Sequence, residues 1–422
     1  MPEPGTSALA AGDRQLSVAD ARAAIAAALK PIAGREVVPL MQALGRVLGE
    51  DVLSPIAVPA HDNSAMDGYA LAGAELRANE ATVLRVVGTL FAGTPFAGRV
   101  GPGECLRIMT GAVMPEGLDT VVPLELCRTE EALVWIAPGT IQPGENRRRR
   151  GEDLAQGRPA LHAGRVLRPA DLGLIASLGI AEVNVMRRLR VALFSTGDEL
   201  RTLGQALDPG CVYDSNRFSL MGALQRLGME VIDLGLVRDD PAALQATLES
   251  AVAQADVLLT SGGVSAGDAD YTRSLLGRMG EVGFWKVAMR PGRPFAFGPL
   301  RGDSQARWLF ALPGNPVAAL VTFYAFVREG LLQLAGATPD PLPVLRARCT
   351  HAIRKRPGRT EFLRGRLAPA GDAGWEVQIT GAQGSGILRS MSEANALVVL
   401  PHEQGSVAAG EAVDVWIFDG LV

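Results

Sequence analysis

RVALFSTG, residues 190–197, is the first of three apolar stretches that decide the fold, and ADVLLTSGG (255–263) and ARWLFALPG (306–314) are the others. Each is an apolar run of strand length that ends in small or polar residues. The segments between them carry apolar residues at helical spacing, as in 239–255, where acidic residues and a proline open the pattern. Strands that alternate with helices in this way predict a parallel sheet over residues 188–337, covered by helices on both faces.

The chain on either side of this region has a different pattern. Residues 17–29 predict an amphipathic helix with a serine cap, and a second helix is expected around 40–48. Short β-type runs separated by Gly and Pro over residues 81–141 predict a small all-β domain. A helix that starts at a proline is expected at 169–178. The remainder, 338–422, is strand-like and predicts a terminal β-domain.

Composition restricts the class of protein. A length of 422 residues predicts two to four domains, at roughly 100–200 residues per domain. The 41 Lys and Arg against 45 Asp and Glu give a net charge of −4, which argues against a nucleic-acid coat or a basic membrane surface. No apolar run reaches the roughly 18 residues of a membrane span. Because no export signal is visible and the four cysteines form no CxxC pair, we expect a cytoplasmic protein without a zinc knuckle or disulfides.

Three Gly-rich loops follow the three strands, and the carboxyl ends of parallel strands meet at one edge of a sheet. Consecutive glycines let main-chain N–H groups approach an oxyanion, and the flanking hydroxyls add donors. None of the loops has the GK[ST] ending of a Walker A loop or the GxGxxG dinucleotide pattern. We therefore predict a site for phosphate or a similar tetrahedral anion, with these candidates: Ser195, Thr196, Gly197, Ser261, Gly262, Gly263, Ser265, Pro313, Gly314 and Asn315.

Basic residues supply a counter-charge for such an anion. Lys286, Arg290 and Arg293 lie in an otherwise apolar stretch. A solvated edge strand with extended side chains would also explain them. Burying charge without a partner is costly, so an anionic ligand is the better explanation of a cluster framed by aromatic residues, namely Phe284, Trp285, Phe295 and Phe297.

Acidic residues recur beside the loops, and carboxylates that converge on a phosphate site commonly hold Mg²⁺. The candidates are Asp67, Asp153, Glu199, Asp239, Asp240, Asp268 and Asp270. Asp239 and Asp240 precede Pro241 and are equally suited to cap the helix that follows. Glu199 and Asp270 have no comparable structural role, so they favour function. The four histidines lack metal spacing, and we interpret them as surface or packing residues.

Eight motifs, in this order, resemble the MoeA and gephyrin E-domain family of molybdopterin molybdenumtransferases. They are DNSAMDGYA (62–70), RIMTGAVMPEG (107–117), RRRGED (148–153), VALFSTGDEL (191–200), YDSNR (213–217), TSGGVSAGDADYT (260–272), FWKVAMRPGRPFAFG (284–298) and LPGNPVAA (312–319). The similarity runs from about residue 17 to the C-terminus. A series of motifs over nearly the whole chain is far more specific than any one glycine loop.

The resemblance implies an elongated homodimer with four domains per subunit. These are a discontinuous first domain (1–54 and 151–187), an inserted β-domain (55–150), a three-layer α/β molybdopterin-binding domain with a mostly parallel sheet (188–337) and a C-terminal β-barrel (338–422). In the family the active site lies between the central domain of one subunit and the second domain of its partner. Asp67 and Thr110 would therefore complete the site of the opposite chain.

The implied reaction inserts molybdate into the dithiolene of adenylylated molybdopterin and releases AMP, with Mg²⁺ assisting. The Gly-rich turns with Lys286, Arg290 and Arg293 would hold phosphates and molybdate. Asp239, Asp270 and Glu199 would bind Mg²⁺ or position water, Asp67 would orient the metal or molybdate, and Arg359 and Ser385 match cleft-facing loops of the family's terminal domain. The implied partners include the molybdopterin adenylyltransferase and recipient apo-molybdoenzymes. Residues 290 and 293 are often lysine in relatives, and arginine keeps the charge while offering a planar fork.

Two other functions stay open. A related domain clusters receptors at synapses, so a non-catalytic scaffold is one alternative, although a scaffold has no physical need for carboxylates beside anion loops. A nucleotide pyrophosphatase is the other, because the central fold is shared with proteins that cleave such bonds. It would not need the inserted β-domain or Asp67. Fold alone does not decide function, so the site residues and the motifs favour the transferase.

Overall fold

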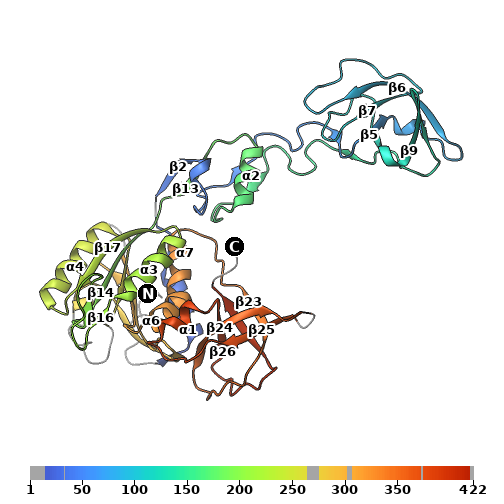
Figure 1. The fold of residues 1–422 in the computed structure, drawn as a ribbon. Coiled ribbons are helices and arrows are strands. Elements are labelled where there is room, and N and C mark those ends of the chain that lie inside the picture. Colours follow the sequence, from blue (N-terminus) through green and yellow to red (C-terminus); the bar gives the residue numbers. More distant parts are fainter. Residues whose placement is uncertain (1–14, 33, 264–274, 302–306, 372–373, 419–422) are drawn as a thin grey trace, which may run out of the picture.

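The computed structural model describes residues 15–32, 34–263, 275–301, 307–371 and 374–418 of the chain. Figure 1 shows an elongated molecule, with an α/β body and a β-barrel at one end and a small β-domain at the other. A narrow middle part that contains β2, β13 and α2 joins the two ends.

The α/β body is built on a seven-stranded sheet. In spatial order its strands are β1 (Gln15–Leu16), β19 (Gly283–Val287), β21 (Pro294–Leu300), β22 (Arg307–Leu312), β18 (Val257–Ser261), β14 (Arg190–Thr196) and β17 (Glu230–Val237). The last four are parallel, as predicted. β21 is antiparallel to both β19 and β22, so the sheet is mostly, and not wholly, parallel, as the resemblance implied. The turn between β19 and β21 is too short for the crossover that parallel strands require.

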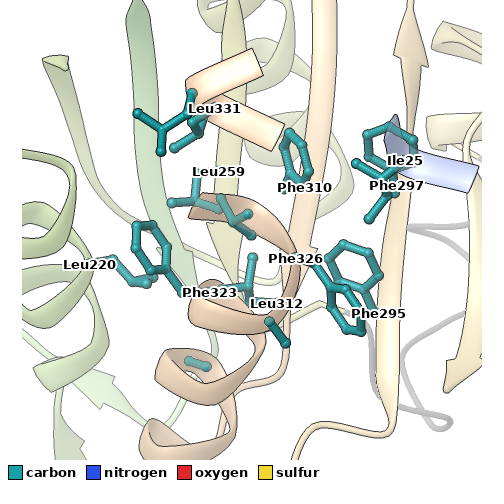
Figure 2. Close-up of a cluster of buried hydrophobic side chains, with 14 of the residues drawn as sticks. Ile25, Leu220, Leu259, Phe295, Phe297, Phe310, Leu312, Phe323, Phe326 and Leu331 are labelled. Carbon is teal, nitrogen blue, oxygen red and sulfur yellow. The ribbon is translucent and has the colours of Figure 1, made fainter. Parts of the chain in front are cut away.

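Helices cover both faces of the sheet, as predicted. On one face Leu244 and Leu248 of α4 (Pro241–Gln254) pack with Phe194 of β14. On the other face Ile25 and Leu220 belong to a larger cluster (Figure 2). This second face is covered by α1 (Val18–Ala28), α3 (Ser215–Arg226), α6 (Pro316–Thr322), the π-helical turn η4 (Phe323–Val327) and α7 (Arg328–Leu334).

One continuous helical stretch runs from Pro316 to Leu334 and comprises α6, η4 and α7. Within the described residues it is the one helix long and apolar enough to cross a membrane, with a mean hydropathy of 1.4. We expected no such segment, because charges, Gly or Pro interrupt every apolar run of the sequence. However, 72% of its apolar window is buried inside the protein, so it is a core helix of the α/β body.

The N-terminal segment joins the α/β body. The predicted helix at 17–29 is confirmed as α1, and its cap Ser17 accepts a hydrogen bond from the Asp20 amide at 3.0 Å. β1 pairs with β19, and Ile25 of α1 belongs to the core cluster of the central sheet. The four-domain division with its boundaries stays a prediction.

The second predicted helix, at 40–48, is wrong. The segment contains only the 3₁₀ turn η1 (Leu40–Gln42). Beyond it, the Leu48 amide donates to the Arg165 carbonyl at 2.8 Å, so the main chain bonds across to a distant segment instead of to itself. Around it lie β2 (Arg35–Pro39), which pairs with β13 (Glu182–Met186), and α2 (Pro169–Ser177), which confirms the helix predicted at 169–178.

The small β-domain predicted over 81–141 is confirmed as a six-stranded sheet. Its order is β8 (Thr120–Pro123), β5 (Gly68–Leu71), β7 (Glu104–Ile108), β6 (Thr82–Leu90), β10 (Leu133–Ile136) and β9 (Cys127–Glu130).

Short elements elsewhere include β3 (Val52–Leu53), β4 (Asn63–Ser64), η2 (Gly73–Glu75), η3 (Leu124–Leu126), β11 (Arg147–Arg148), β12 (Pro159–Leu161), β15 (Leu200–Arg201) and β16 (Val212–Tyr213).

The predicted C-terminal β-domain is a closed barrel. Its strands follow the order β24 (Thr360–Pro369), β25 (Trp375–Ile379), β23 (Val344–Cys349), β27 (Ala412–Ile417) and β26 (Ala396–Leu400), and β26 pairs back with β24. The short helix α8 (Leu388–Ser392) precedes β26. The strand β20 (Met289–Arg290) leaves the central domain and pairs with β24, which ties the barrel to the α/β body.

Candidate functional site

Three Gly-rich loops meet at the carboxyl ends of β14, β18 and β22. Gly262 lies at their centre, because a Cβ atom built on it would lie 2.3 Å from the Thr196 carbonyl oxygen. A Cβ atom built on Gly314 would lie 3.9 Å from the Cα atom of Gly262, and the Gly262 amide donates to the Leu312 carbonyl at 3.0 Å. With a φ of +97° as well, position 262 admits only glycine without strain.

The first loop places two carboxylates beside its glycine. The Thr196 hydroxyl donates a hydrogen bond to Asp239, which lies at the end of β17. A Cβ atom on Gly197 would lie 2.7 Å from a carboxylate oxygen of Glu199, so that side chain covers the glycine. Asp239 and Glu199 are both exposed. They therefore flank residues 196–197 from two sides and remain accessible to a ligand.

The neighbouring acidic residue has a structural role instead. The Asp240 carboxylate accepts a hydrogen bond from the Ala243 amide at 2.9 Å and caps α4. The pair that sequence left open is thus divided, because Asp240 caps the helix and Asp239 contacts the first loop.

This division predicts different stability effects. We expect Asp240→Ala to lower the free energy of unfolding by about 1 kcal/mol, the usual cost of losing an N-cap. Asp239→Asn keeps an acceptor for Thr196, so we expect it to cost less than half as much. Urea unfolding of both variants measures the difference, and equal losses would contradict the assignment of the cap.

Asn216, which sequence reasoning missed, connects the second and third loops. Its side-chain amide donates to the Ser261 hydroxyl at 2.7 Å and to the Gly314 carbonyl at 2.6 Å. The Ser261 hydroxyl itself lies 3.5 Å from the Pro313 carbonyl. Asn216 is in the first turn of α3, two residues after the helix cap Asp214. An Asp-Ser-Asn sequence before a helical pattern is a signal for a cap, but it does not reveal contacts to two other loops.

A buried ionic network holds the end of β14, where the first loop begins. Asp214 is only 1% exposed, and it accepts hydrogen bonds from the Ser195 hydroxyl at 2.9 Å and from Arg217 Nε at 3.0 Å. Arg217 also pairs with Asp233 at 2.5 Å. The predicted anion-binding residue Ser195 is itself buried and engaged with Asp214. Its hydroxyl therefore anchors the loop, and sequence gave no sign of this.

The basic stretch is arranged differently from the sequence expectation. Lys286, Arg290 and Arg293 are all exposed, so the argument that their charge is buried is wrong. Trp285 is 2% exposed and lies with Phe295 and Phe297 in the core cluster. Alternation along β19 explains why Lys286 is exposed while Trp285 is buried, because successive side chains of a strand point to opposite faces.

The C-terminal barrel reaches the third loop. Pro313 and Gly314 lead into Asn315, the cap of α6, and the Val317 amide in the first turn donates to the Ser385 carbonyl at 3.0 Å. Arg359 Nε donates to the buried carboxylate of Glu361 at 2.8 Å, and Glu361 is paired in register with Arg290. Residues of the α/β body and of the C-terminal barrel therefore lie together beside the third loop.

Asp67 and Thr110 lie elsewhere in the chain. The Asp67 carboxylate accepts hydrogen bonds from the amide and the hydroxyl of Thr110, both at 2.7 Å. These two hydrogen bonds hold the pKa of Asp67 below its ordinary value, so the group is ionised at neutral pH. Asp67 directly precedes β5 and Thr110 follows β7, so both belong to the small β-domain, which lies at the opposite end of the molecule from the α/β body (Figure 1).

Part of the predicted site lies outside the described residues. Ser265, Asp268 and Asp270 belong to the segment 264–274, which is not described. In the part of the chain that is described, no three His, Cys, Asp or Glu side chains lie together in a way that could hold a metal ion. The predicted trio of Asp239, Asp270 and Glu199 therefore stays a prediction.

Three parts of the chain match known protein families. Residues 16–179 match the MoeA N-terminal region (domain I and II), residues 192–333 a probable molybdopterin binding domain, and residues 346–418 the MoeA C-terminal region (domain IV). A Haemophilus influenzae protein named molybdopterin molybdenumtransferase is 42% identical over 388 residues, which are 92% of this chain and 95% of that protein. The chain belongs to the MoeA family.

A second relative and a solved structure lead to the same family assignment. The Mycobacterium tuberculosis protein named molybdopterin molybdenumtransferase 2 is 39% identical over 389 residues, 90% of this chain and 94% of its own. A crystal structure of the molybdopterin biosynthesis moeA protein from Pyrococcus horikoshii matches with a TM-score of 0.81 at 27% identity. It covers 96% of this chain and 100% of its own. The Gly-rich loops lie in the segment that matches the molybdopterin binding domain, and Ser385 lies in the MoeA C-terminal region.

Proposed function

We propose that the protein is a molybdopterin molybdenumtransferase, which inserts molybdate into the dithiolene of adenylylated molybdopterin and releases AMP. The observation that carries the proposal is the meeting of three Gly-rich loops at one sheet edge, with two carboxylates on the first loop. Main-chain amides and hydroxyls in such loops suit phosphate oxygens. The names of relatives 37–42% identical to the chain support the same activity.

In this proposal the residues at the edge of the central sheet divide into groups that bind different parts of the substrates. Ser261, Gly262 and Gly263 hold the phosphates, and Thr196 and Gly197 form the facing wall. Lys286, Arg290, Arg293 and Arg359 give the positive charge that the phosphates and molybdate require, and Pro313, Gly314, Asn315 and Ser385 close the edge at the start of α6. Arg290 and Arg293 each present a planar fork to the oxyanion.

Magnesium fits the donors on the first loop. Mg²⁺ binds through one or two carboxylates and completes its shell with water and substrate phosphates. Asp239 keeps one carboxylate oxygen free of its contact with Thr196, and Glu199 is exposed beside Gly197. We propose that these two residues, with Asp270, hold Mg²⁺. When bound, the ion would act as a Lewis acid on the phosphoric anhydride.

A homodimer is part of the proposal. Met41 is 92% exposed, and Val37, Leu44 and Leu53 in the same stretch of sequence are more than half exposed. Such a group of apolar side chains is typical of a protein interface. Asp67 precedes β5 and Thr110 follows β7 in the small β-domain, at the opposite end of the molecule from the α/β body (Figure 1), so we propose that they complete the site of the partner subunit. We also propose a cytoplasmic location and contacts with the molybdopterin adenylyltransferase and apo-molybdoenzymes.

The test mixes the purified protein with adenylylated molybdopterin, Mg²⁺ and molybdate and follows AMP and metal-loaded cofactor together. We expect both products, each dependent on molybdate. AMP without metal insertion would replace the proposal with a pyrophosphatase. Tight binding without either product would indicate a scaffold.

Asn216 provides a test of the loop arrangement. We expect Asn216→Ala to raise the half-saturating concentration of adenylylated molybdopterin about tenfold, because two hydrogen bonds that fix the second and third loops are lost. Gln225→Ala, an exposed position on the same helix, is the control. Steady-state AMP release measures both. An unchanged value for Asn216→Ala would show that the loops keep their positions without it.

A further inference from the structure

Arg364 is a cation inside the C-terminal barrel. It lies on β24 and is 0% exposed, although its guanidinium is charged at every ordinary pH. It forms no ion pair with a carboxylate in the described part of the chain, whereas Arg46 and Arg217, the other buried arginines there, each form one. Burial lowers the pKa of Arg364 to about 10, and nearby Arg290 contributes. An unpaired buried charge is costly, so something specific must keep it there.

Main-chain carbonyls of one exposed segment take the place of a carboxylate. Arg364 Nη1 donates to the Gln383 carbonyl at 3.2 Å, and Nη2 donates to the carbonyls of Ala382 at 3.3 Å and Gly384 at 3.0 Å. Nε donates to the Ser390 hydroxyl at 3.0 Å. Three consecutive carbonyls therefore point inward to one guanidinium.

Peptide geometry then fixes the direction of the next amides. In a trans peptide the N–H of a residue points opposite to the carbonyl of the residue before it. The amides of Gln383, Gly384 and Ser385 consequently point away from Arg364. Within the described structure these three amides donate to no other main-chain or side-chain group. Ala382 and Gly384 are exposed, so the amides face outward. Successive outward amides form a concave anion-binding surface.

This segment lies at the edge where the two domains meet. The Ser385 carbonyl accepts the hydrogen bond of the Val317 amide at the start of α6, directly after the third loop. In the barrel, Arg290 of β20 is paired in register with Glu361 of β24, the strand that carries Arg364. Residues 383–385 thus lie next to the third loop, at the junction of the α/β body and the barrel.

We propose that Arg364 is a positioning residue: its buried guanidinium holds the carbonyls of residues 382–384 inward, so that the amides of residues 383–385 bind a tetrahedral oxyanion. Arg364 does not touch the oxyanion itself. The inference rests on the proposed function for the identity of the oxyanion, which is molybdate or a phosphate group of the substrate. The role of Arg364 is the same for either.

The experiment compares the full-length wild type with Arg364→Lys, Arg364→Met and Asn395→Ala. Lysine keeps the charge, but its single ammonium cannot hold three carbonyls in one plane. Asn395 is the matched control, because it braces the same strand through two hydrogen bonds to the main chain of Leu367, at 2.8 and 3.0 Å, and does not contact residues 382–385. Molybdate and inorganic phosphate are titrated separately by calorimetry, and thermal melting reports folding.

We expect both Arg364 variants to weaken binding of one of the two anions by about tenfold, the scale of a lost charge-assisted hydrogen bond, with Asn395→Ala unchanged. Loss for molybdate alone assigns the amides to molybdate, and loss for phosphate alone assigns them to the substrate. Binding as tight as wild type in Arg364→Lys would overturn the positioning role, since charge alone would then suffice.

A second measurement needs no variant. Hydrogen exchange of the wild type is followed with and without the anion that binds, and we expect slower exchange for the amides of residues 383–385. Unchanged exchange there would overturn the inference. A wild type that binds neither anion and releases no AMP would instead refute the proposed function, so the two failures are distinguishable.

Discussion

Lys286→Ala is expected to lower the rate of AMP release and metal insertion at least about 100-fold, the usual scale for removing one group that stabilises developing negative charge. Trp285 and Val287 on either side of it are buried in the core, so the position between them faces the opposite side of β19 and is exposed. Alanine removes the charge and leaves the buried neighbours in place, so we expect little change in the thermal midpoint.

The control for this variant is Lys30→Ala, since Lys30 is another exposed lysine and lies just beyond α1. Product formation is measured with both products followed together. If Lys30→Ala loses as much activity as Lys286→Ala, the effect is general electrostatics and the assignment of Lys286 to the site is wrong. Activity within twofold of the wild type for Lys286→Ala leads to the same conclusion.

Mixing two inactive variants is expected to restore activity. Asp67→Ala and Lys286→Ala should each be nearly inactive alone. If Asp67 acts in the partner's site, a mixed dimer has one site with both changes and one site with neither. Random exchange of subunits makes half of the dimers mixed, so roughly a quarter of the wild-type activity should return.

The mixing experiment also decides whether the site is shared. The two variants are exchanged by mild dissociation and reassociation, and the same treatment of each variant alone is the control. No recovery in the mixture, with mixed dimers shown by mass spectrometry, would mean that Asp67 and Lys286 belong to one chain's site. The distance between the two domains in Figure 1 leads us to expect recovery.

Local pattern predicted most elements because it reflects which side chains must be buried. The apolar runs of β14, β18 and β22 and the cap of α1 were visible in this way. The expected helix at 40–48 failed because its main chain bonds to residue 165 and beyond, a contact that helical spacing does not report. The cations at 286, 290 and 293 were expected to be buried, but all three are exposed, and for Lys286 the reason is strand alternation between buried Trp285 and Val287.

By itself the sequence determined the strand-and-helix order, the Gly-rich loops at the sheet edge and the family. Those features depend on local preferences, in which the side chains of a short segment determine the conformation of that same segment. Only the tertiary structure decided that Asn216 joins two loops, that Asp214 anchors Ser195 and that Arg364 turns the segment 382–384 inward. These contacts join residues far apart in sequence, and their geometry depends on how the strands and domains pack, which no local preference encodes.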